Sequence, residues 1–404
     1  MIKLAHAKLG DISNNFDKLR VPLSVGQREI LEKKYRYYGA QGVIDHVDGY
    51  LFDGEYILVA EDGENLKSQK NNICNYVTGK FWVNNHAHII NASNGNNTKY
   101  LYYKLNLINF RGYITGSAQP KLTKENLNSI VLHVHQGDEQ QKIAAVLSAL
   151  DAKIELNNRI NAELETMAKT LYDYWFVHFD FPAQNGRPYK SSGGRMVYNE
   201  TLKRKIPEGW SDGTLDDLGQ IVGGSTPSTK NPENFNNKGT PWITPNDLSN
   251  NSGNKFISRG AQDVTDEGIK NASLKKYPAG TVLLSSRAPI GYMAIAREEV
   301  TTNQGFKSFI PINGYSSAFI YYTVKNSLKA ITQYASGSTF KEVSGAVLKT
   351  VKICLPDSEL AEGFTNIINP IFKRQDVLEQ ENQQLAQLRD WLLPMLMNGQ
   401  VTVT

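Results

Sequence analysis

The sequence predicts an α+β protein in which two globular mixed α/β domains are separated by two long antiparallel coiled-coil-like helices, related by a pseudo-two-fold internal repeat. Three observations predict it. A long apolar seam runs through the middle of the chain, a copy of it recurs 221 residues later, and short sequence echoes precede both copies in the same order. A two-fold relation between the copies requires the two helices to run antiparallel.

The first long helix is predicted from Asp138 to about Val177. Apolar residues recur there at alternating steps of four and three, and two asparagines fill the polar steps, which is the pattern of a coiled-coil seam. Asp138 is a suitable N-cap, with Gln141 three residues later. The seam comprises Ile143, Leu147, Leu150, Ile154, Asn157, Asn161, Leu164, Ala168, Leu171 and Trp175.

The second long helix repeats this seam near the C-terminus. Its seam residues are Phe364, Ile368, Ile371, Leu378, Asn382, Leu385, Leu392 and Leu396, and subtracting 221 from each gives a seam position of the first helix. Pro370 is expected to kink it in its early turns. We hypothesise that Asn161 and Asn382 meet near the axis as polar register markers. Such a seam is also typical of a generic oligomerisation helix, but the matched pair favours packing within one chain.

The helices divide the chain into five expected segments. Leu9-Gly10-Asp11-Ile12 opens the first domain, and Leu218-Gly219-Gln220-Ile221 echoes it in the second. Proline and glycine between the domains indicate a loop or linker. The expected segments are a mixed domain at 1–136, the central long helix at 137–180, the linker at 181–209, a second mixed domain at 210–356, and the C-terminal long helix with its tail at 357–404.

Composition restricts the class of protein. The chain has 404 residues and a net charge of +4, which permits a polyanionic partner without requiring one. No apolar run approaches the ~20 residues that span a bilayer, and the first ten residues lack a signal-peptide core. Cys74 and Cys354 lie in different halves and are expected to be reduced thiols. These features favour a cytoplasmic protein without a membrane partner.

Catalytic motifs are absent from the sequence. An adenine methyltransferase needs an Asn-Pro-Pro-aromatic run, and the nearest match is Asn231-Pro232-Glu233-Asn234. No phosphate-binding Gly-x-x-x-x-Gly-Lys-Ser/Thr loop occurs. His86 and His88 have no cysteine or carboxylate at metal-ligand spacing. The sequence therefore predicts a binding protein, not an enzyme, with no metal or cofactor of its own.

Several motifs occur in order in both halves, each set followed by a long helix. They are Tyr37-Tyr38-Gly39-Ala40, Phe52-Asp53-Gly54-Glu55-Tyr56, Trp82-Val83-Asn84-Asn85-His86-Ala87-His88, Gly224-Ser225-Thr226-Pro227-Ser228, Pro241-Trp242-Ile243-Thr244-Pro245, Ser285-Ser286-Arg287-Ala288-Pro289-Ile290-Gly291, Thr302-Asn303-Gln304-Gly305-Phe306 and Gly337-Ser338-Thr339-Phe340. Across essentially the whole chain, the sequence resembles the specificity (S) subunit of type I restriction-modification systems.

The resemblance implies a sequence-specific recognition subunit for double-stranded DNA. Each domain would be a target-recognition domain that reads one half of a bipartite site. The helices would set the spacer and dock two modification (methyltransferase) subunits, and restriction subunits would then join. The resemblance also implies S-adenosylmethionine on the modification subunit, and ATP and Mg on the restriction subunit.

Candidate DNA contacts are side chains that suit base edges or phosphates. They are Tyr37, Tyr38, Lys80, Asn84, Asn85, His86 and Ser117 in the first half, and Ser225, Thr226, Lys230, Ser285, Ser286, Arg287, Thr302, Asn303, Gln304, Ser338, Thr339 and Lys341 in the second. Tyr37 and Tyr38 are expected in a loop. Structural alternatives stay open: plain turns, a carboxylate partner for Arg287, and hydrogen bonds from Thr302-Asn303-Gln304 to the domain's own backbone. His86 and His88 would share a face that is simply solvated.

Two other functions compete with DNA recognition. One is a two-headed, non-enzymatic binding or scaffold protein that does not act on DNA, and salt-sensitive binding to bipartite duplex DNA separates the two. The other is a self-contained restriction enzyme, which would need the catalytic motifs that the sequence lacks.

Overall fold

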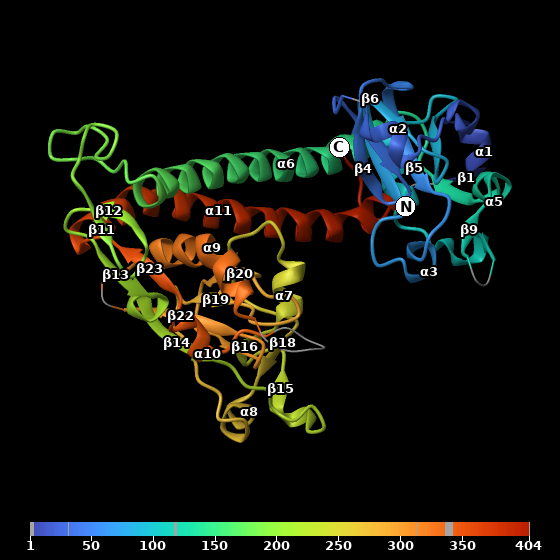
Figure 1. Ribbon diagram of the computed structural model, residues 1–404. Coiled ribbons are helices and arrows are strands. Elements are labelled where there is room, and N and C mark those ends of the chain that lie inside the picture. The colour runs from blue at the N-terminus through green and yellow to red at the C-terminus, as the bar shows by residue number, and fades with distance from the viewer. Residues whose placement is uncertain (1–3, 31, 117–118, 313, 336–341, 404) are drawn as a thin grey trace. The chain divides into compact units, whose positions relative to one another are not determined.

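The computed structural model describes residues 4–30, 32–116, 119–312, 314–335 and 342–403. The chain forms two compact units: the first comprises Met1–Glu155 with Asn382–Thr404, and the second comprises Leu156–Glu381. Two long helices, α6 (Glu139–Tyr172) and α11 (Ser358–Met397), each contribute to both units (Figure 1). A short π-helix, η3 (Asp173–Val177), continues α6.

The first unit is built around a six-stranded sheet of order β2-β7-β5-β6-β3-β4. Its remaining elements are short helices and two strand pairs, β1–β10 and β8–β9. The bounds are β1 Ala5–Lys8, α1 Leu9–Ile12, β2 Ser13–Asn15, η1 Asp17–Leu19, α2 Val25–Glu29, β3 Tyr35–Gly39, β4 Gly42–Val47, β5 Phe52–Ala60, α3 Asn65–Ser68, β6 Cys74–Val83, β7 Ala87–Ala92, α4 Thr98–Leu105, η2 Phe110–Tyr113, β8 Ile114–Thr115, β9 Lys121–Leu122, α5 Lys124–Ser129 and β10 Val131–Val134.

The second unit carries a five-stranded sheet of order β14-β22-β19-β20-β17 and a four-stranded sheet of order β15-β18-β16-β21. Two strand pairs, β11–β12 and β13–β23, complete it. The bounds are β11 Met196–Asn199, β12 Arg204–Pro207, β13 Ser211–Thr214, η4 Leu215–Leu218, β14 Gly219–Gly223, η5 Pro232–Asn234, β15 Phe235–Asn236, β16 Thr240–Ile243, α7 Pro245–Asn250, β17 Phe256–Ile257, β18 Gln262–Val264, α8 Asp266–Asn271, β19 Val282–Leu284, β20 Met293–Ala296, β21 Thr301–Thr302, β22 Lys307–Pro311, α9 Ser317–Gln333, α10 Gly345–Leu348 and β23 Lys352–Leu355.

The two units share one strand arrangement. The order β2-β7-β5-β6-β3 matches β14-β22-β19-β20-β17 strand for strand, and in both the last strand pairs in parallel while the others pair antiparallel. A helix capped by a polar side chain follows, α4 behind Asn97 and α9 behind Ser316. In both, the domain's first strand pairs with the strand that precedes the long helix, as β1–β10 and β13–β23.

The long helices pack antiparallel within each unit. In the second, Asn157 donates to Glu381 while Trp175, farther along α6, contacts Phe364, earlier on α11. In the first unit, Ile143 and Leu147 share a core with Leu396, and Asp151 pairs with Arg389. Most of the predicted seam is buried or half-buried. Asn161 and Asn382 belong to different units, so their meeting at the axis stays a prediction.

Two local expectations were wrong. Tyr37 and Tyr38 lie in β3 and are buried, because β3 pairs with both β4 and β6. The expected linker contains the β11–β12 hairpin, whose Ile206 packs into the core of the second unit. α11 runs through Pro370 without a break, and the kink expected there stays a prediction. None of the helices that the structure describes is both long and apolar enough to cross a bilayer.

Candidate nucleic-acid interface

In each unit two turns meet at the same edge of the equivalent sheet. In the first unit one turn follows β5 and the other precedes β7. In the second unit one turn follows β19 and the other precedes β22. We call these two turns the turn pair. In the first unit the Glu61 N–H donates to the carbonyl of His86 over 2.9 Å. In the second, the Ser286 N–H donates to the carbonyl of Gly305 over 2.8 Å. The same backbone bond therefore joins the turn pair in both.

An asparagine shapes the second turn in both units. The Asn84 Oδ1 accepts the His86 N–H over 2.9 Å, and the Asn303 Oδ1 accepts the Gly305 N–H over 2.9 Å. Asn303 is thus the counterpart of Asn84. These two side-chain oxygens hold their own turns, as expected for asparagine in a turn.

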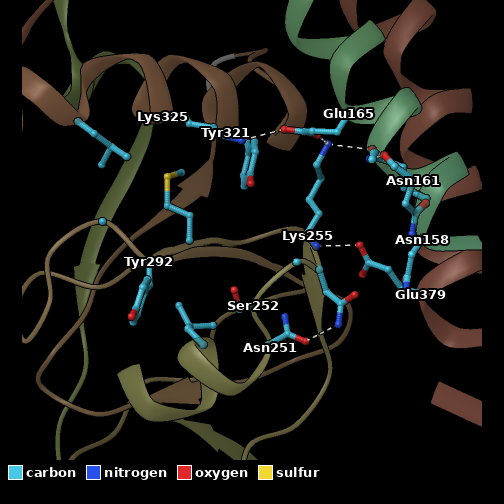
Figure 2. Close-up of a pocket in the computed structure, with 18 residues that line it drawn as sticks. Asn158, Asn161, Glu165, Asn251, Ser252, Lys255, Tyr292, Tyr321, Lys325 and Glu379 are labelled. Carbon is cyan, nitrogen blue, oxygen red and sulfur yellow. Dashed lines mark hydrogen bonds and ion pairs between the residues drawn. The ribbon is translucent and has the colours of Figure 1, made fainter. Parts of the chain in front are cut away.

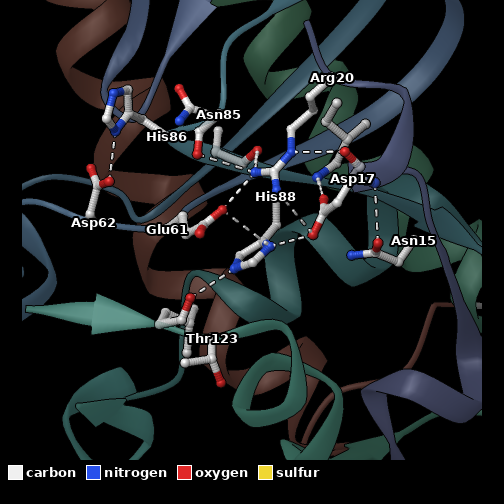
Figure 3. A network of polar contacts seen from close by, with 12 residues as sticks. Asn15, Asp17, Arg20, Glu61, Asp62, Asn85, His86, His88 and Thr123 are labelled. Carbon is white, nitrogen blue, oxygen red and sulfur yellow. Dashed lines mark hydrogen bonds and ion pairs between the residues drawn. The ribbon is translucent and has the colours of Figure 1, made fainter. Parts of the chain in front are cut away.

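Buried ion pairs support the turn pair of the first unit (Figure 3). The His88 Nδ1 lies 2.6 Å from the Asp17 Oδ2, and its Nε2 lies 2.8 Å from the carbonyl of Leu122. Burial raises the pKa of the Asp17 carboxyl, but its hydrogen bond to His88 and the His88 charge outweigh this and hold the pKa below its usual range. His88 is only 1% exposed, so the expectation that it is solvated was wrong.

Arg20 ties this network to the second turn. Its guanidinium donates to the Glu61 carboxylate over 2.6 Å and to the carbonyls of Asn85 and Ala87, on either side of His86, over 3.3 and 2.9 Å. The turn is therefore held from beneath, and the side chains of Asn85 and His86 are left exposed. The His86 Nδ1 lies 2.6 Å from the Asp62 carboxylate (Figure 3).

The other candidates of the first unit fall into two groups. Lys80 is exposed on β6, with its Nζ 4.6 Å from the centre of the Tyr50 ring. Tyr37 and Tyr38 are 1% and 6% exposed, and the Tyr37 hydroxyl accepts the Leu23 N–H. Burial removes both tyrosines from the candidate interface. Ser117 lies outside the described residues.

Glycine allows a close backbone approach in the second unit. A Cβ on Gly224 would lie 2.2 Å from the carbonyl oxygens of both Thr302 and Asn303. Next to it, the Ser225 N–H donates to the Thr302 carbonyl over 3.0 Å, and the Thr226 hydroxyl bonds to Gln304. Thr226 and Gln304 are exposed at this turn, and Lys230 is exposed four residues after Thr226.

Three candidates of the second unit are fully buried. The Ser285 hydroxyl donates to the Pro289 carbonyl over 2.7 Å and accepts the Tyr292 N–H over 2.8 Å. Ser286 and Thr302 are also 0% exposed. We withdraw the expectation that these side chains contact DNA, because they are enclosed within the fold. Ser338, Thr339 and Lys341 lie outside the described residues.

A shared carboxylate holds two cations near the second turn pair. Arg287 and Lys307 each lie 3.7 Å from Glu342, so the carboxylate partner considered for Arg287 is present. Lys307 is not among the residues predicted from the sequence; it lies on β22, paired with Gly223 of β14. In the part of the chain that the structure describes, no three metal-ligating side chains form a group that could hold an ion.

Two copies of one mixed domain, each leading into a long helix and each exposing polar turns at one sheet edge, define a duplicated recognition protein. The chain belongs to the family of the type I restriction modification DNA specificity domain, whose model matches residues 4–166 and again residues 207–387.

Similar proteins include specificity subunits of type I restriction enzymes, and a solved structure has a similar fold. The MjaIX specificity subunit of Methanocaldococcus jannaschii is 40% identical over 205 residues, which are 50% of this chain and 46% of that subunit. The chain therefore spans under half of that relative. The HindI specificity subunit of Haemophilus influenzae is 28% identical over 332 residues, covering 70% of this chain and 71% of the relative. The S subunit from M. genitalium has a similar fold, with a TM-score of 0.65 at 14% identity over 98% of this chain and 96% of that one.

Proposed function

We propose that this chain is the DNA-recognition subunit of a type I restriction-modification complex, in which each domain reads one half of a bipartite target. The observation that carries the proposal is the double match to one DNA specificity domain, on two sheets of identical strand order. A recognition domain that occurs twice in one chain suits a DNA target that has two parts. We further propose that the long helices set the length of the gap between the half-sites.

The chain supplies recognition and leaves the chemistry to its partners. In this proposal the modification subunit carries S-adenosylmethionine, and the restriction subunit carries ATP and Mg. The binding chemistry of this chain is electrostatic and polar, and binding should weaken steeply with salt because phosphate contacts release counterions. Such a complex works on the cell's DNA, and the cytoplasm stays the predicted compartment.

Exposed and half-buried polar side chains are the proposed DNA contacts. In the first unit they are Asn85 and His86 of the turn pair and Lys80 on β6. In the second they are Ser225, Thr226, Lys230, Arg287, Asn303 and Gln304. Amide groups suit adenine, and Arg or Lys suits guanine or phosphate. Arg287 and His86 each face a carboxylate, Glu342 and Asp62, which DNA phosphates would have to displace.

Two apolar patches on the helices support docking of two modification subunits. In the second unit, Met167 of α6, Tyr174 of η3 and Ile367 of α11 are 58%, 50% and 48% exposed and line a groove of about 510 Å³. In the first unit, Leu388 and Trp391 of α11 are 43% and 62% exposed. Exposed apolar side chains gathered in this way mark interaction surfaces.

The 221-residue offset relates the two patches. Leu388 corresponds to Met167 and Trp391 to Thr170, while Ile367 corresponds to the half-buried Val146 of the first unit. Two equivalent surfaces on one chain suit two copies of one partner. We expect Met167→Ser and Trp391→Ser each to lower the number of modification subunits bound from two to one, measured by native mass spectrometry. Ile30→Ser, at an 84% exposed position away from both patches, should leave two bound.

Methylome sequencing tests the proposal directly. Cells that carry this chain with the modification subunit of its own system should methylate one motif made of two short half-sites at a fixed gap. Methylation at a single uninterrupted motif, or none that depends on this chain, would contradict it. Tight binding of a partner other than DNA, unchanged by salt or by added DNA, would instead favour the two-headed scaffold.

A further inference from the structure

A buried lysine joins the second domain (residues 210–356) to both long helices within the second unit. Lys255 precedes β17 and is 5% exposed. Its Nζ lies 2.6 Å from the Glu165 carboxylate of α6 (Figure 2). It also lies 2.8 Å from the Gln375 Oε1 of α11 and 2.9 Å from the Tyr322 hydroxyl of α9. An ammonium has three N–H donors. All three are therefore taken by acceptors on three different helices.

The backbone beside this lysine is fixed by a second carboxylate. Glu379 of α11 accepts the N–H groups of Lys255 and Phe256 over 2.7 and 3.1 Å. Arg297, just after β20, donates to Glu379 over 2.8 Å and also bonds to Asp376 of α11. The edge of the sheet where β17 and β20 pair in parallel is thus held to α11 by directional bonds.

Apolar packing alone would leave the domain freer to shift on the helices than the directional bonds do. Aromatic contacts such as Tyr172 with Tyr322 and Phe256 with Phe372 join the two parts, but burial of apolar surface is non-directional. Beside Lys255 the domain and α6 do not pack closely: a cleft of about 630 Å³ separates them, lined by Asn158 on one side and Tyr292 on the other (Figure 2).

The ionic network is better suited to fixing geometry than to adding stability. Burial raises the pKa of Glu165, but the charges and hydrogen bonds of Lys255 and Lys325 outweigh this and lower the pKa to about 2. Burial lowers the pKa of Lys255 to about 8 in spite of Glu165. The contact stabilises the ionised form of the carboxylate, whereas burial destabilises the charged form of the ammonium, so the two effects on stability oppose each other. In some proteins, buried polar groups of this kind specify a unique arrangement while adding little net stability.

We propose that Lys255, with Glu165, Gln375 and Glu379, is a positioning device that fixes the orientation of the second domain on the helix pair, and thereby the single gap length that the protein accepts. The inference rests on the proposed function, in which this domain reads one half-site. Lys255 need not touch DNA. It determines where the turn pair of its domain lies relative to the two long helices.

Lys255→Met tests this, because methionine keeps much of the side-chain length and loses the three bonds. The wild-type methylome first defines the half-sites and the gap. The wild-type and variant chains, each with the modification subunit, are then tested on duplexes carrying those half-sites at gaps from two base pairs shorter to two longer. We expect methylation at the native gap to fall about tenfold, since a small misplacement of a positioned group costs one to two orders of magnitude. Neighbouring gaps should become substrates while the half-site sequences stay the same.

Two further variants keep the outcome decisive. Lys373→Met removes an exposed positive charge from α11 that makes no hydrogen bond or ion pair with Lys255, Glu165, Gln375 or Glu379, and it should keep the native gap preference. If Lys255→Met does not fold, Tyr322→Phe removes one of the three acceptors and should broaden the gap preference to a smaller extent. A variant that folds and keeps one sharp gap overturns the inference and leaves the proposed function standing. A wild-type chain without a bipartite motif overturns the proposed function itself.

Discussion

The two units stabilise the same turn pair by different chemistry. In the first, side-chain ion pairs do it: Asp17 with His88, and Arg20 with Glu61. In the second, the strand equivalent to β2 ends in glycine, and the close approach of Gly224 to Thr302 lets backbone bonds hold the turn. Both units keep the asparagine that shapes the second turn. Strand order and the turn asparagine are thus the shared frame, and the groups around them differ.

The charged side chains at the turn pair differ between the two units. In the first unit the turn after β5 carries Glu61 and Asp62, which hold Arg20 and His86. In the second unit the equivalent turn carries Ser286 and Arg287, and Glu342 balances Arg287 and Lys307. One frame therefore supports two different sets of polar groups at the same edge, which is what two unlike half-sites would require.

The largest expected effect comes from exchanging the whole second domain. Replacing residues 210–356 with the matching domain of another family member should change one half-site completely and leave the other half-site unchanged. The boundaries keep β13 and β23 together, because Ser211 pairs with Leu355 within the exchanged segment. Methylome sequencing of cells carrying the hybrid with the modification subunit measures this. A change in both half-sites would show that the two domains do not read independently.

A smaller effect is expected from the glycine that distinguishes the second turn pair. Gly224→Ala should lower the free energy of unfolding by about 3 kcal/mol, since a Cβ there meets two carbonyl oxygens that belong to packed backbone. Gly345→Ala is the matched control. Its Cβ would meet nothing closer than 3.8 Å, and alanine suits the first turn of α10. Chemical denaturation of the full chain should separate the variants, and equal stability of the two would refute the close-approach argument.

The long helices could be predicted from the sequence because their signal is local. A seam repeated over many turns needs no knowledge of partners, and α6 with η3 and α11 lie where the pattern places them. The offset of 221 also predicts which residue of one long helix corresponds to which residue of the other. The strand pairs β1–β10 and β13–β23 were not predicted, because they join segments far apart in the sequence and leave no local pattern.

The candidate site could be located only in part. Asn84 and Asn303 lie in the turns that meet in each unit, because a turn asparagine bonds to its own backbone two residues on. Burial could not be predicted: Ser285, Ser286, Tyr37 and Tyr38 look like surface residues by type, and tertiary packing encloses them. Lys307 was missed because only its strand register, opposite Gly223, places it beside the turn pair.

The smallest expected effect is a difference in acid sensitivity at Glu165. Its pKa of about 2 lies below the ordinary 4.5, so its contribution to stability is present above pH 4.5 and is lost as the pH falls toward 2. Glu165→Gln should therefore be less stable than the wild type by about 2 kcal/mol near pH 7, because burial of Lys255 offsets part of the full shift. The difference should shrink to about a quarter of that value by pH 2.5 and reach zero only below pH 2, when the wild-type carboxyl is largely protonated. Lys255, Lys325 and Tyr322 bond to Glu165 and are unchanged in the variant. Denaturation curves of both proteins from pH 7 to pH 2.5 measure the difference, and a gap that stays constant with pH would show that Glu165 is not held ionised by the lysines.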